Sequence, residues 1–219
     1  MSEKRDNSLE HQRERVLLAA LPHVPFDGWS RAAMAAGVAD AGLDESTALR
    51  AFPAGAPELV EYFSTYTDQR MTAVLEKTDL AGMRVRDRVT TGVKVRLDLL
   101  ARHREAVRRA CSYLALPQNV ALGLRCLYRT VDAVWRAAGD TSTDFNFYTK
   151  RALLAGVYSS TLLYWLNDES EDFEDTAAFL DRRIADVMEF EKARGRVKKF
   201  LTPSSNPLRR SRTRAPGGP

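Results

Sequence analysis

A stretch without one charged residue runs from Ala152 to Leu166, and it constrains the fold more than any other feature of the chain. Its 15 residues are too few for a membrane-spanning helix, which needs about 20. A helix that is apolar on every side has no face for water, so we expect it in the middle of a helical bundle. The sequence therefore predicts an all-α protein built around a central helix from Asp144 to Leu166.

The start of this helix has a different character. Polar and charged residues alternate with Phe145 and Phe147, and Thr143 or Asp144 can cap the helix by accepting a backbone N–H hydrogen bond. The helix thus combines an apolar body with an amphipathic, aromatic start. The alternative interpretation is a core helix with an ordinary polar start, and composition alone favours it.

Apolar residues also recur every three or four positions elsewhere, as they do in amphipathic helices. No segment alternates as a strand would, and Gly37 and Asp172 are expected to end one helix and to cap another. We predict a bundle of about nine helices with an N-terminal helix-turn-helix. The expected helices cover residues 9–21, 30–36, 44–52, 58–76, 80–100, 105–116, 118–138, 144–166 and 172–201. The expected domains are 9–76 (helix-turn-helix), 80–191 (helical, ligand-binding) and 192–219 (basic end and tail).

One long helix followed by two short helices around a Gly-containing turn is the outline of a helix-turn-helix. Between residues 26 and 70, three arginines against seven acids give a net charge of −4, whereas a DNA-binding surface must neutralise phosphates with cations. The recognition helix would span Asp44 to Ala51 and begin with two acids, where base readout normally uses Arg, Lys, Asn or Gln. We interpret the module as kept for packing, with DNA binding as the alternative.

The formal net charge of +4 is unevenly distributed. Nine Lys or Arg residues and no acid follow Glu191, so residues 1–191 carry 24 bases against 29 acids, a net charge of −5. The segment beyond Glu191 combines basic and apolar residues, which predicts weak binding to an anionic membrane surface. A solvated tail is the alternative. The residues expected to bind membrane are Lys192, Arg194, Arg196, Lys198, Lys199, Phe200 and Leu201.

Residue patterns typical of catalysis are missing. The three histidines are scattered, and the chain has no GxSxG, HExxH or phosphate-binding glycine loop. Cys111 and Cys126 form no CxxC motif and indicate buried thiols in a reducing compartment. The acidic run NDESEDFEDT lacks the spacing of a calcium loop, and helix capping explains it better than a metal. We therefore expect no catalytic residue, no metal and no cofactor, hence no enzyme.

Two resemblances follow from longer stretches. The pieces ERVLLAALPHVPFDGWSRAAMAAGVADAGL and ALRAFPAGAPELVEYF resemble the N-terminal domain of TetR-type regulators. The pieces HVPFDGWSRAAMAAG, DFNFYTKRALLAGVYSSTLLYWLND and DFEDTAAFLDRRI together resemble the coenzyme Q-nine family of ubiquinone-biosynthesis accessory proteins. The second resemblance covers about residues 9 to 200, and residues 144–184 are its most diagnostic part.

The coenzyme Q-nine resemblance implies a TetR-like fold, an isoprenoid lipid (a ubiquinone intermediate) in an apolar cavity, and assistance to the di-iron demethoxyubiquinone hydroxylase. It implies no nucleic acid as a partner, and TetR-like proteins commonly form homodimers through their last two long helices. The implied partner-binding residues are Asp144, Asn146, Phe147, Tyr148 and Arg151. The central helix is expected to wall the lipid cavity with Leu154, Val157, Tyr158, Thr161, Leu162 and Trp165.

The expected location follows from the N-terminal residues. Glu3, Asp6, Glu10 and Glu14 argue against a mitochondrial transit peptide, which is poor in acids, and no apolar run resembles a signal peptide. We therefore expect a bacterial protein of the cytoplasm, peripherally associated with the inner membrane. The predicted function is a lipid-binding accessory protein that presents a polyisoprenoid intermediate of ubiquinone biosynthesis to its hydroxylase. A TetR-type ligand-responsive transcriptional regulator is the alternative.

Overall fold

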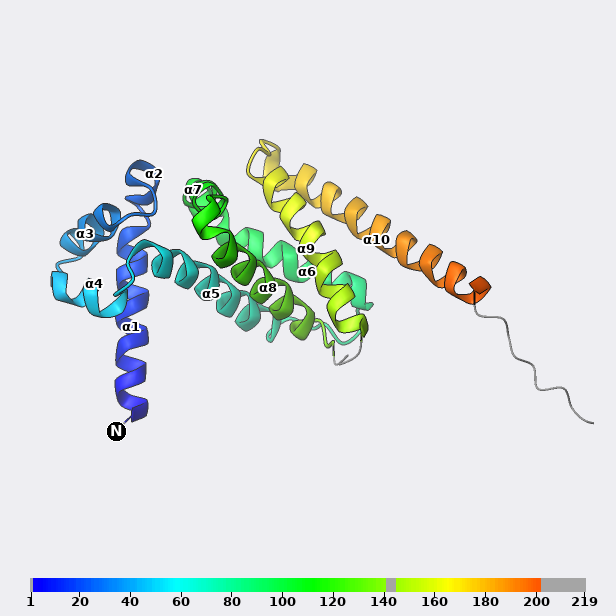
Figure 1. Ribbon diagram of the computed structural model, residues 1–219, viewed down its shortest axis with the longest axis horizontal. Coiled ribbons are helices and arrows are strands. Elements are labelled where there is room, and N and C mark those ends of the chain that lie inside the picture. Colours follow the sequence, from blue (N-terminus) through cyan, green and yellow to red (C-terminus); the bar gives the residue numbers. More distant parts are fainter. Residues whose placement is uncertain (1, 141–144, 202–219) are drawn as a thin grey trace, which may run out of the picture. The chain divides into compact units, whose positions relative to one another are not determined.

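The computed structural model describes the backbone of residues 2–140 and 145–201 and the side chains of residues 9–140 and 147–189. Every regular element in these ranges is a helix, which confirms the all-α prediction. Each expected helix has a counterpart, and α2 is an additional helical turn (Figure 1). The elements are α1 (Ser2–Ala20), α2 (Val24–Asp27), α3 (Arg31–Asp40), α4 (Glu45–Ala51), α5 (Ala56–Leu75), α6 (Val85–Leu100), η1 (Ala101–His103), α7 (Arg104–Leu114), η2 (Pro117–Asn119), α8 (Val120–Ala137), α9 (Phe145–Trp165), η3 (Glu171–Phe173) and α10 (Glu174–Leu201).

A close crossing of α1 and α3 holds the N-terminal helices together. Ser30 caps α3 by accepting a hydrogen bond from the Ala33 N–H at 3.1 Å, as predicted. The expectation that Gly37 ends this helix is wrong, because Gly37 lies inside α3. A Cβ at Gly37 would lie 2.4 Å from the Ala19 carbonyl oxygen. Glycine is needed there because the two backbones touch, and Gly42, with φ of +60°, makes the turn after the helix instead.

Helix α5 connects the N-terminal helices to the larger bundle. It packs against α1 on one side and against α6 and α8 on the other (Figure 1). Its buried side chains include Leu59, Val60 and Met71, each at most 1% exposed. Helix α9 then packs on α8 and α6, so α5, α6, α8 and α9 enclose the main core.

The charge-free part of α9 is buried on one side only, which corrects the expectation of burial all round. Leu154, Thr161 and Trp165 are at most 3% exposed, whereas Leu163 is 57% exposed and Gly156 also faces solvent. The described neighbours of α9 cover one side of it. The absence of charged residues from this part of α9 therefore allows burial but does not require it. The outward face of α9 carries apolar and small side chains.

Asp168 organises the connection from α9 to α10, and the expectation that Asp172 caps the last helix is wrong. Asp172 and Phe173 have φ values of +47° and +58°, a left-handed backbone conformation that interrupts the chain between η3 and α10. The Asp168 carboxylate accepts hydrogen bonds from the Thr176 N–H and the Ser170 N–H, both at 2.8 Å, and from both hydroxyls. The acids that follow lie in the first turn of α10, where the helix dipole favours them.

We expect Asp168→Ala to lower the free energy of unfolding at pH 7 by about 1–2 kcal/mol, because backbone N–H groups at the start of α10 lose their acceptor. Burial alone would raise the pKa of Asp168, but the hydrogen bonds from Ser170 and Thr176 lower it to about 2. A depressed native pKa stabilises the fold above the ordinary value near 4 and stops doing so as the pH falls toward 2. Urea unfolding of both proteins at pH 6 and pH 3 should show a smaller difference at pH 3. An equal difference at both pH values would contradict this role for the carboxylate.

The C-terminal end of α9 is also held from α7. Arg104 donates hydrogen bonds to the carbonyl oxygens of Trp165, at 2.6 Å, and Asp168. Arg108 donates to the Leu166 carbonyl oxygen and to the side-chain oxygen of Asn167. These arginines satisfy carbonyl groups that a helix end leaves without a partner in the helix.

The chain divides into two units, Met1–Ile184 and Ala185–Pro219, because most contacts are made within each unit. In the second unit the structure describes the remainder of α10, as far as Leu201. The expected boundaries between residues 76 and 80 and at residue 191 stay predictions.

Candidate functional site

A buried arginine shapes the start of α9. Arg151 is 3% exposed and pairs with Asp132 at 2.7 Å and with Asp140 at 3.2 Å. Its guanidinium also lies 3.4 Å from the centre of the Phe147 ring and donates to the Phe147 carbonyl oxygen. Arg151 therefore contributes to a surface by holding its neighbours in place, since its own charge is buried.

Among the described side chains of this helix start, Tyr148 is the most exposed aromatic one. It is 67% exposed, and its ring meets the Phe147 ring edge-on at 5.1 Å. Because Phe147 is fixed by Arg151, the Tyr148 ring is presented from a rigid base. Of the other expected partner-binding residues, Asp144 lies outside the described residues, and for Asn146 only the backbone is described.

An apolar cavity of about 280 Å³ lies among α5, α6, α7, α8 and α9. Its wall is mostly aliphatic and aromatic, and it includes both cysteines. Burial raises the pKa of the Cys111 and Cys126 thiols, so both stay protonated at neutral pH. Two of the expected lipid-binding residues, Tyr158 and Leu162, line this cavity. Leu154, Val157 and Thr161 are buried but line neither this cavity nor the second one described below.

One end of the apolar cavity is polar, which residue patterns alone did not reveal. Arg96, 5% exposed, donates to the Asp68 carboxylate at 2.7 Å, to the Tyr158 hydroxyl and to the Ser64 hydroxyl at 3.3 Å. Thr130 donates to both Asp68 oxygens at 3.0 Å. We name these five residues the Arg96 network. It pairs one buried cation with one buried anion inside the bundle.

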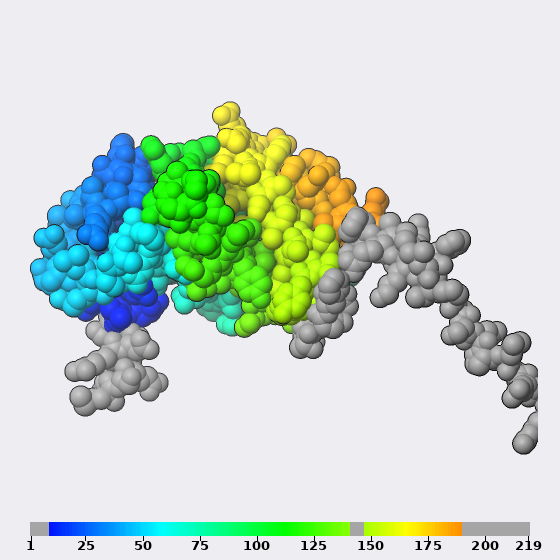
Figure 2. Space-filling model, viewed as in Figure 1, coloured from blue at the N-terminus to red at the C-terminus, as the bar shows by residue number. Residues whose placement is uncertain are grey.

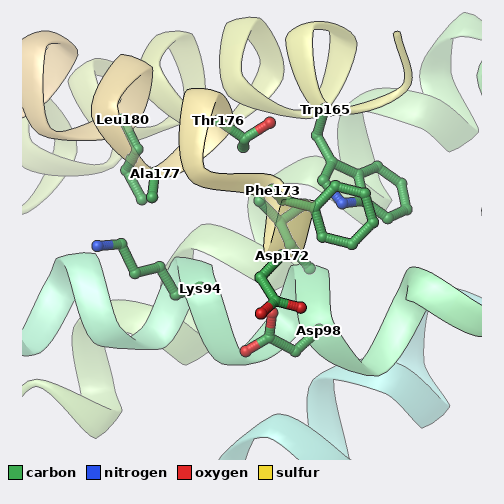
Figure 3. A pocket seen from close by; sticks show the side chains of 9 residues that line it. Lys94, Asp98, Trp165, Asp172, Phe173, Thr176, Ala177 and Leu180 are labelled. Atoms are coloured by element: carbon green, nitrogen blue, oxygen red, sulfur yellow. The ribbon is translucent and has the colours of Figure 1, made fainter. Parts of the chain in front are cut away.

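A second cavity of about 210 Å³ lies between α6 and the start of α10, and Trp165 is part of its wall (Figure 3). The Asp98 and Asp172 carboxylates point toward one another there (Figure 3). Burial raises the pKa of Asp98, and Lys94 partly opposes this shift. The Trp165 indole N–H has no acceptor within the described residues. This cavity is smaller and more polar than the first, so the first is the better candidate for a lipid.

The structure also bears on the expectations about metal sites, membrane-spanning helices, the basic end and α4. In the described part of the chain, no three His, Cys, Asp or Glu side chains are grouped as a metal site would need. None of the described helices has both the length and the apolar character to cross a bilayer. The residues expected to bind membrane lie in the last turns of α10, where only the backbone is described. In α4, Arg50 bonds to the Ser46 and Thr47 hydroxyls of its own helix.

Solved structures show the fold of the chain. A TetR transcriptional regulator from Nitrosomonas europaea matches 79% of this chain and 95% of its own length, with a TM-score of 0.66 and 21% sequence identity. At this identity the likeness establishes a TetR-like fold and nothing about function. The predicted fold class is confirmed.

Sequence comparisons identify relatives over most of the chain. The model of the COQ9 family matches residues 120–191. The ubiquinone biosynthesis protein COQ9 of Rattus norvegicus is 41% identical over 204 residues, or 90% of this chain and 65% of the rat protein. The Homo sapiens protein of that name is 40% identical over 90% of this chain and 64% of its own length. The chain thus spans less than two thirds of the relatives that it matches.

These relatives overturn the expected location. Their names place them in mitochondria, which contradicts a bacterial cytoplasm and inner membrane. That expectation depended on the acids among the first residues of the chain. The composition of those residues does not indicate a location, because the relatives contain further sequence beyond the part that this chain matches. The resemblance to the coenzyme Q-nine (COQ9) family seen in the sequence is confirmed by the shared identity over 90% of the chain, by the matched family model and by the TetR-like fold.

Proposed function

We propose that the protein is a lipid-binding accessory factor of mitochondrial ubiquinone biosynthesis. In this proposal it holds a polyisoprenoid intermediate in the apolar cavity among α5 to α9 and presents it to the demethoxyubiquinone hydroxylase. The observation that carries the proposal is the cavity itself, about 280 Å³ with a mostly apolar wall, in a chain whose relatives are named ubiquinone biosynthesis proteins. The protein would contribute binding to the reaction, and the hydroxylase would contribute the chemistry.

Lipid extraction tests the proposal directly. The purified protein should release isoprenoid lipid that mass spectrometry identifies. Ala110 lines the cavity and is 8% exposed, so Ala110→Leu should narrow the cavity and reduce the amount of lipid. Ala121→Leu, on the exposed side of α8, is the matched control and should carry as much lipid as the wild type. Wild-type protein free of lipid after purification from a ubiquinone-producing host would contradict the proposal.

Tyr148→Ala is expected to weaken association with the hydroxylase by at least about 2 kcal/mol, roughly a 30-fold rise in Kd. Exposed aromatic side chains on a rigid base commonly dominate protein interfaces. The matched control is Phe26→Ala, because Phe26 is 85% exposed on α2, away from α9. Titration calorimetry would show an unchanged Kd for Phe26→Ala. If Tyr148→Ala also binds as the wild type does, the interface lies elsewhere.

The outward face of α9 supports a homodimer as part of this proposal. Leu163 is 57% exposed beside small residues, as expected for a surface that a second copy covers. Leu163→Glu should convert a dimer into a monomer in light scattering at micromolar concentration. Leu49→Glu changes a leucine that is 52% exposed on α4 and should leave the dimer intact. A strictly monomeric wild type would exclude this arrangement.

Contact with an anionic membrane completes the proposal, through the basic end from Lys192 to Leu201. Its support is the sequence, which places nine bases and no acid after Glu191. Flotation with liposomes that contain anionic lipid compares the full chain with a chain ending at Glu191. The shorter chain should float less, and salt should weaken flotation of the full chain. Equal flotation of the two chains would exclude this role.

A further inference from the structure

The Arg96 network has more hydrogen-bond donors than acceptors. The Tyr158 and Ser64 hydroxyl oxygens both accept from Arg96. A hydroxyl also carries one proton to donate. Neither hydroxyl donates to an acceptor anywhere in the described residues, while Thr130 already donates to both Asp68 oxygens. Both side chains line the apolar cavity, so their donors are available to a molecule that carries an acceptor.

The polar end of the cavity is also electrically neutral. Arg96 is the one charged residue among those that line the cavity, and the Asp68 carboxylate compensates it at 2.7 Å. Burial raises the pKa of Tyr158 to about 12, so the phenol keeps its proton. A carboxylate or phosphate placed here would bring a buried negative charge with no cation left to balance it. The preferred acceptor is therefore an uncharged oxygen, such as a carbonyl oxygen.

The position of the network orients the ligand. Arg96 and Tyr158 are each 5% exposed, whereas Ala115, at the α7 end of the cavity wall, is exposed. The polar end is thus buried at Arg96 and Tyr158 and half-buried at Ser64, and the apolar wall leads from it toward the surface formed by α7 and α8 (green in Figure 2). The cavity of about 280 Å³ is at the lower limit of small-molecule sites, which range over roughly 300–1,000 Å³. It accommodates one end of a long isoprenoid and not its whole length.

We propose that the cavity recognises the ring end of its ligand, binding a quinone head-first with a ring carbonyl oxygen at the Tyr158 and Ser64 hydroxyls. This inference rests on the proposed lipid-binding function and adds to it the direction of the ligand and the two hydroxyls that recognise its ring. Arg96 acts through the two hydroxyls, since it fixes both oxygens from behind and leaves their protons directed to the ligand. The isoprenoid tail lies along the apolar wall and leaves between α7 and α8.

Competition binding on the full chain tests the inference. Each probe displaces a fluorescent apolar lipid: a ubiquinone with a two-isoprene tail, a terpene hydrocarbon with the same number of isoprene units, and oleate. The wild type should bind the quinone about tenfold more tightly than the hydrocarbon, and oleate more weakly than the quinone. Ser64→Ala and Tyr158→Phe each remove one donor and should each reduce the preference for the quinone about three- to tenfold. Leu162→Ala is the control, because it changes the apolar wall and should weaken quinone and hydrocarbon alike.

The possible results are distinct. A quinone preference that both donor variants lose supports the inference, and Ser64→Ala keeps the test valid if Tyr158→Phe fails to fold, since Ser64 lies outside the tightly buried core. Equal binding of quinone and hydrocarbon, unchanged preference in the variants, or oleate binding as tight as quinone would overturn it while leaving lipid binding intact. Failure of all three probes to bind the wild type would overturn both the inference and the proposed function.

Discussion

Replacing Asp68 with alanine is expected to lower the free energy of unfolding by about 3–5 kcal/mol. The change leaves the Arg96 guanidinium, 5% exposed, without its counter-charge inside the bundle, and it removes the acceptor of Thr130. Thermal unfolding of a chain of this size should show a melting temperature lower by on the order of 10 °C. No other interaction in the described residues joins α5, α6 and α8 through a buried cation and a buried carboxylate.

The double variant Asp68→Leu with Arg96→Met separates charge from packing. It removes both charges and replaces them with apolar side chains, so it should recover most of the stability that the single change loses. It should also abolish the preference for a quinone, because the Tyr158 and Ser64 hydroxyls lose the group that orients them. If the double variant is as unstable as Asp68→Ala, an uncompensated charge is not the cause of the loss.

Arg151→Ala is the second change with a large expected effect, also about 3–5 kcal/mol in the free energy of unfolding. Two carboxylates, Asp132 and Asp140, lose a buried cation, although Lys150 still contacts Asp140 at 2.7 Å. The Phe147 ring loses the guanidinium that lies against it. Lysine at this position is a poor substitute, because it cannot reach both carboxylates with a planar fork of donors.

This prediction has a functional side that distinguishes it from a simple loss of stability. At a temperature where Arg151→Ala remains folded, its Kd for the hydroxylase should rise at least as much as that of Tyr148→Ala, since the base of the aromatic surface is lost. Urea unfolding and binding calorimetry on the same preparation provide both readouts. Full stability of Arg151→Ala would mean that other groups compensate the two carboxylates.

The sequence predicted the helices well, because amphipathic periodicity is a local property of each segment. It also predicted an amphipathic, aromatic start for α9, where Tyr148 is exposed, although composition alone favoured an ordinary polar start. The Arg96 network escaped prediction for a physical reason: Asp68 and Arg96 are 28 residues apart, and only packing of α5 on α6 joins them. A signal was present, since Arg96 falls among the buried positions of its helix, between Val93 and Leu97. A charge at such a position indicates a buried partner but does not identify it.

The wrong predictions at the ends of α3 and α10 also arose because packing and backbone geometry are not visible in a local sequence pattern. Gly37 and Asp172 are of the residue types that end and cap helices, and a residue type alone cannot report that two backbones touch or that a chain turns with positive φ. Asp168 does the capping because the turn brings it to the Thr176 N–H, eight positions later. For α9, absence of charge did not predict which side the neighbouring helices would leave uncovered.

The arginine contacts from α7 to the end of α9 affect the order in which the molecule can fold. Arg104 and the Trp165 carbonyl oxygen are 61 residues apart in sequence, so their contact closes a long loop that contains α8. The last turn of α9 gains its partners only after that loop has closed, which places its completion late in folding. In the native protein the amides of this turn should exchange their hydrogens slowly, through opening of α7 and α9 together, and not by fraying of one helix end.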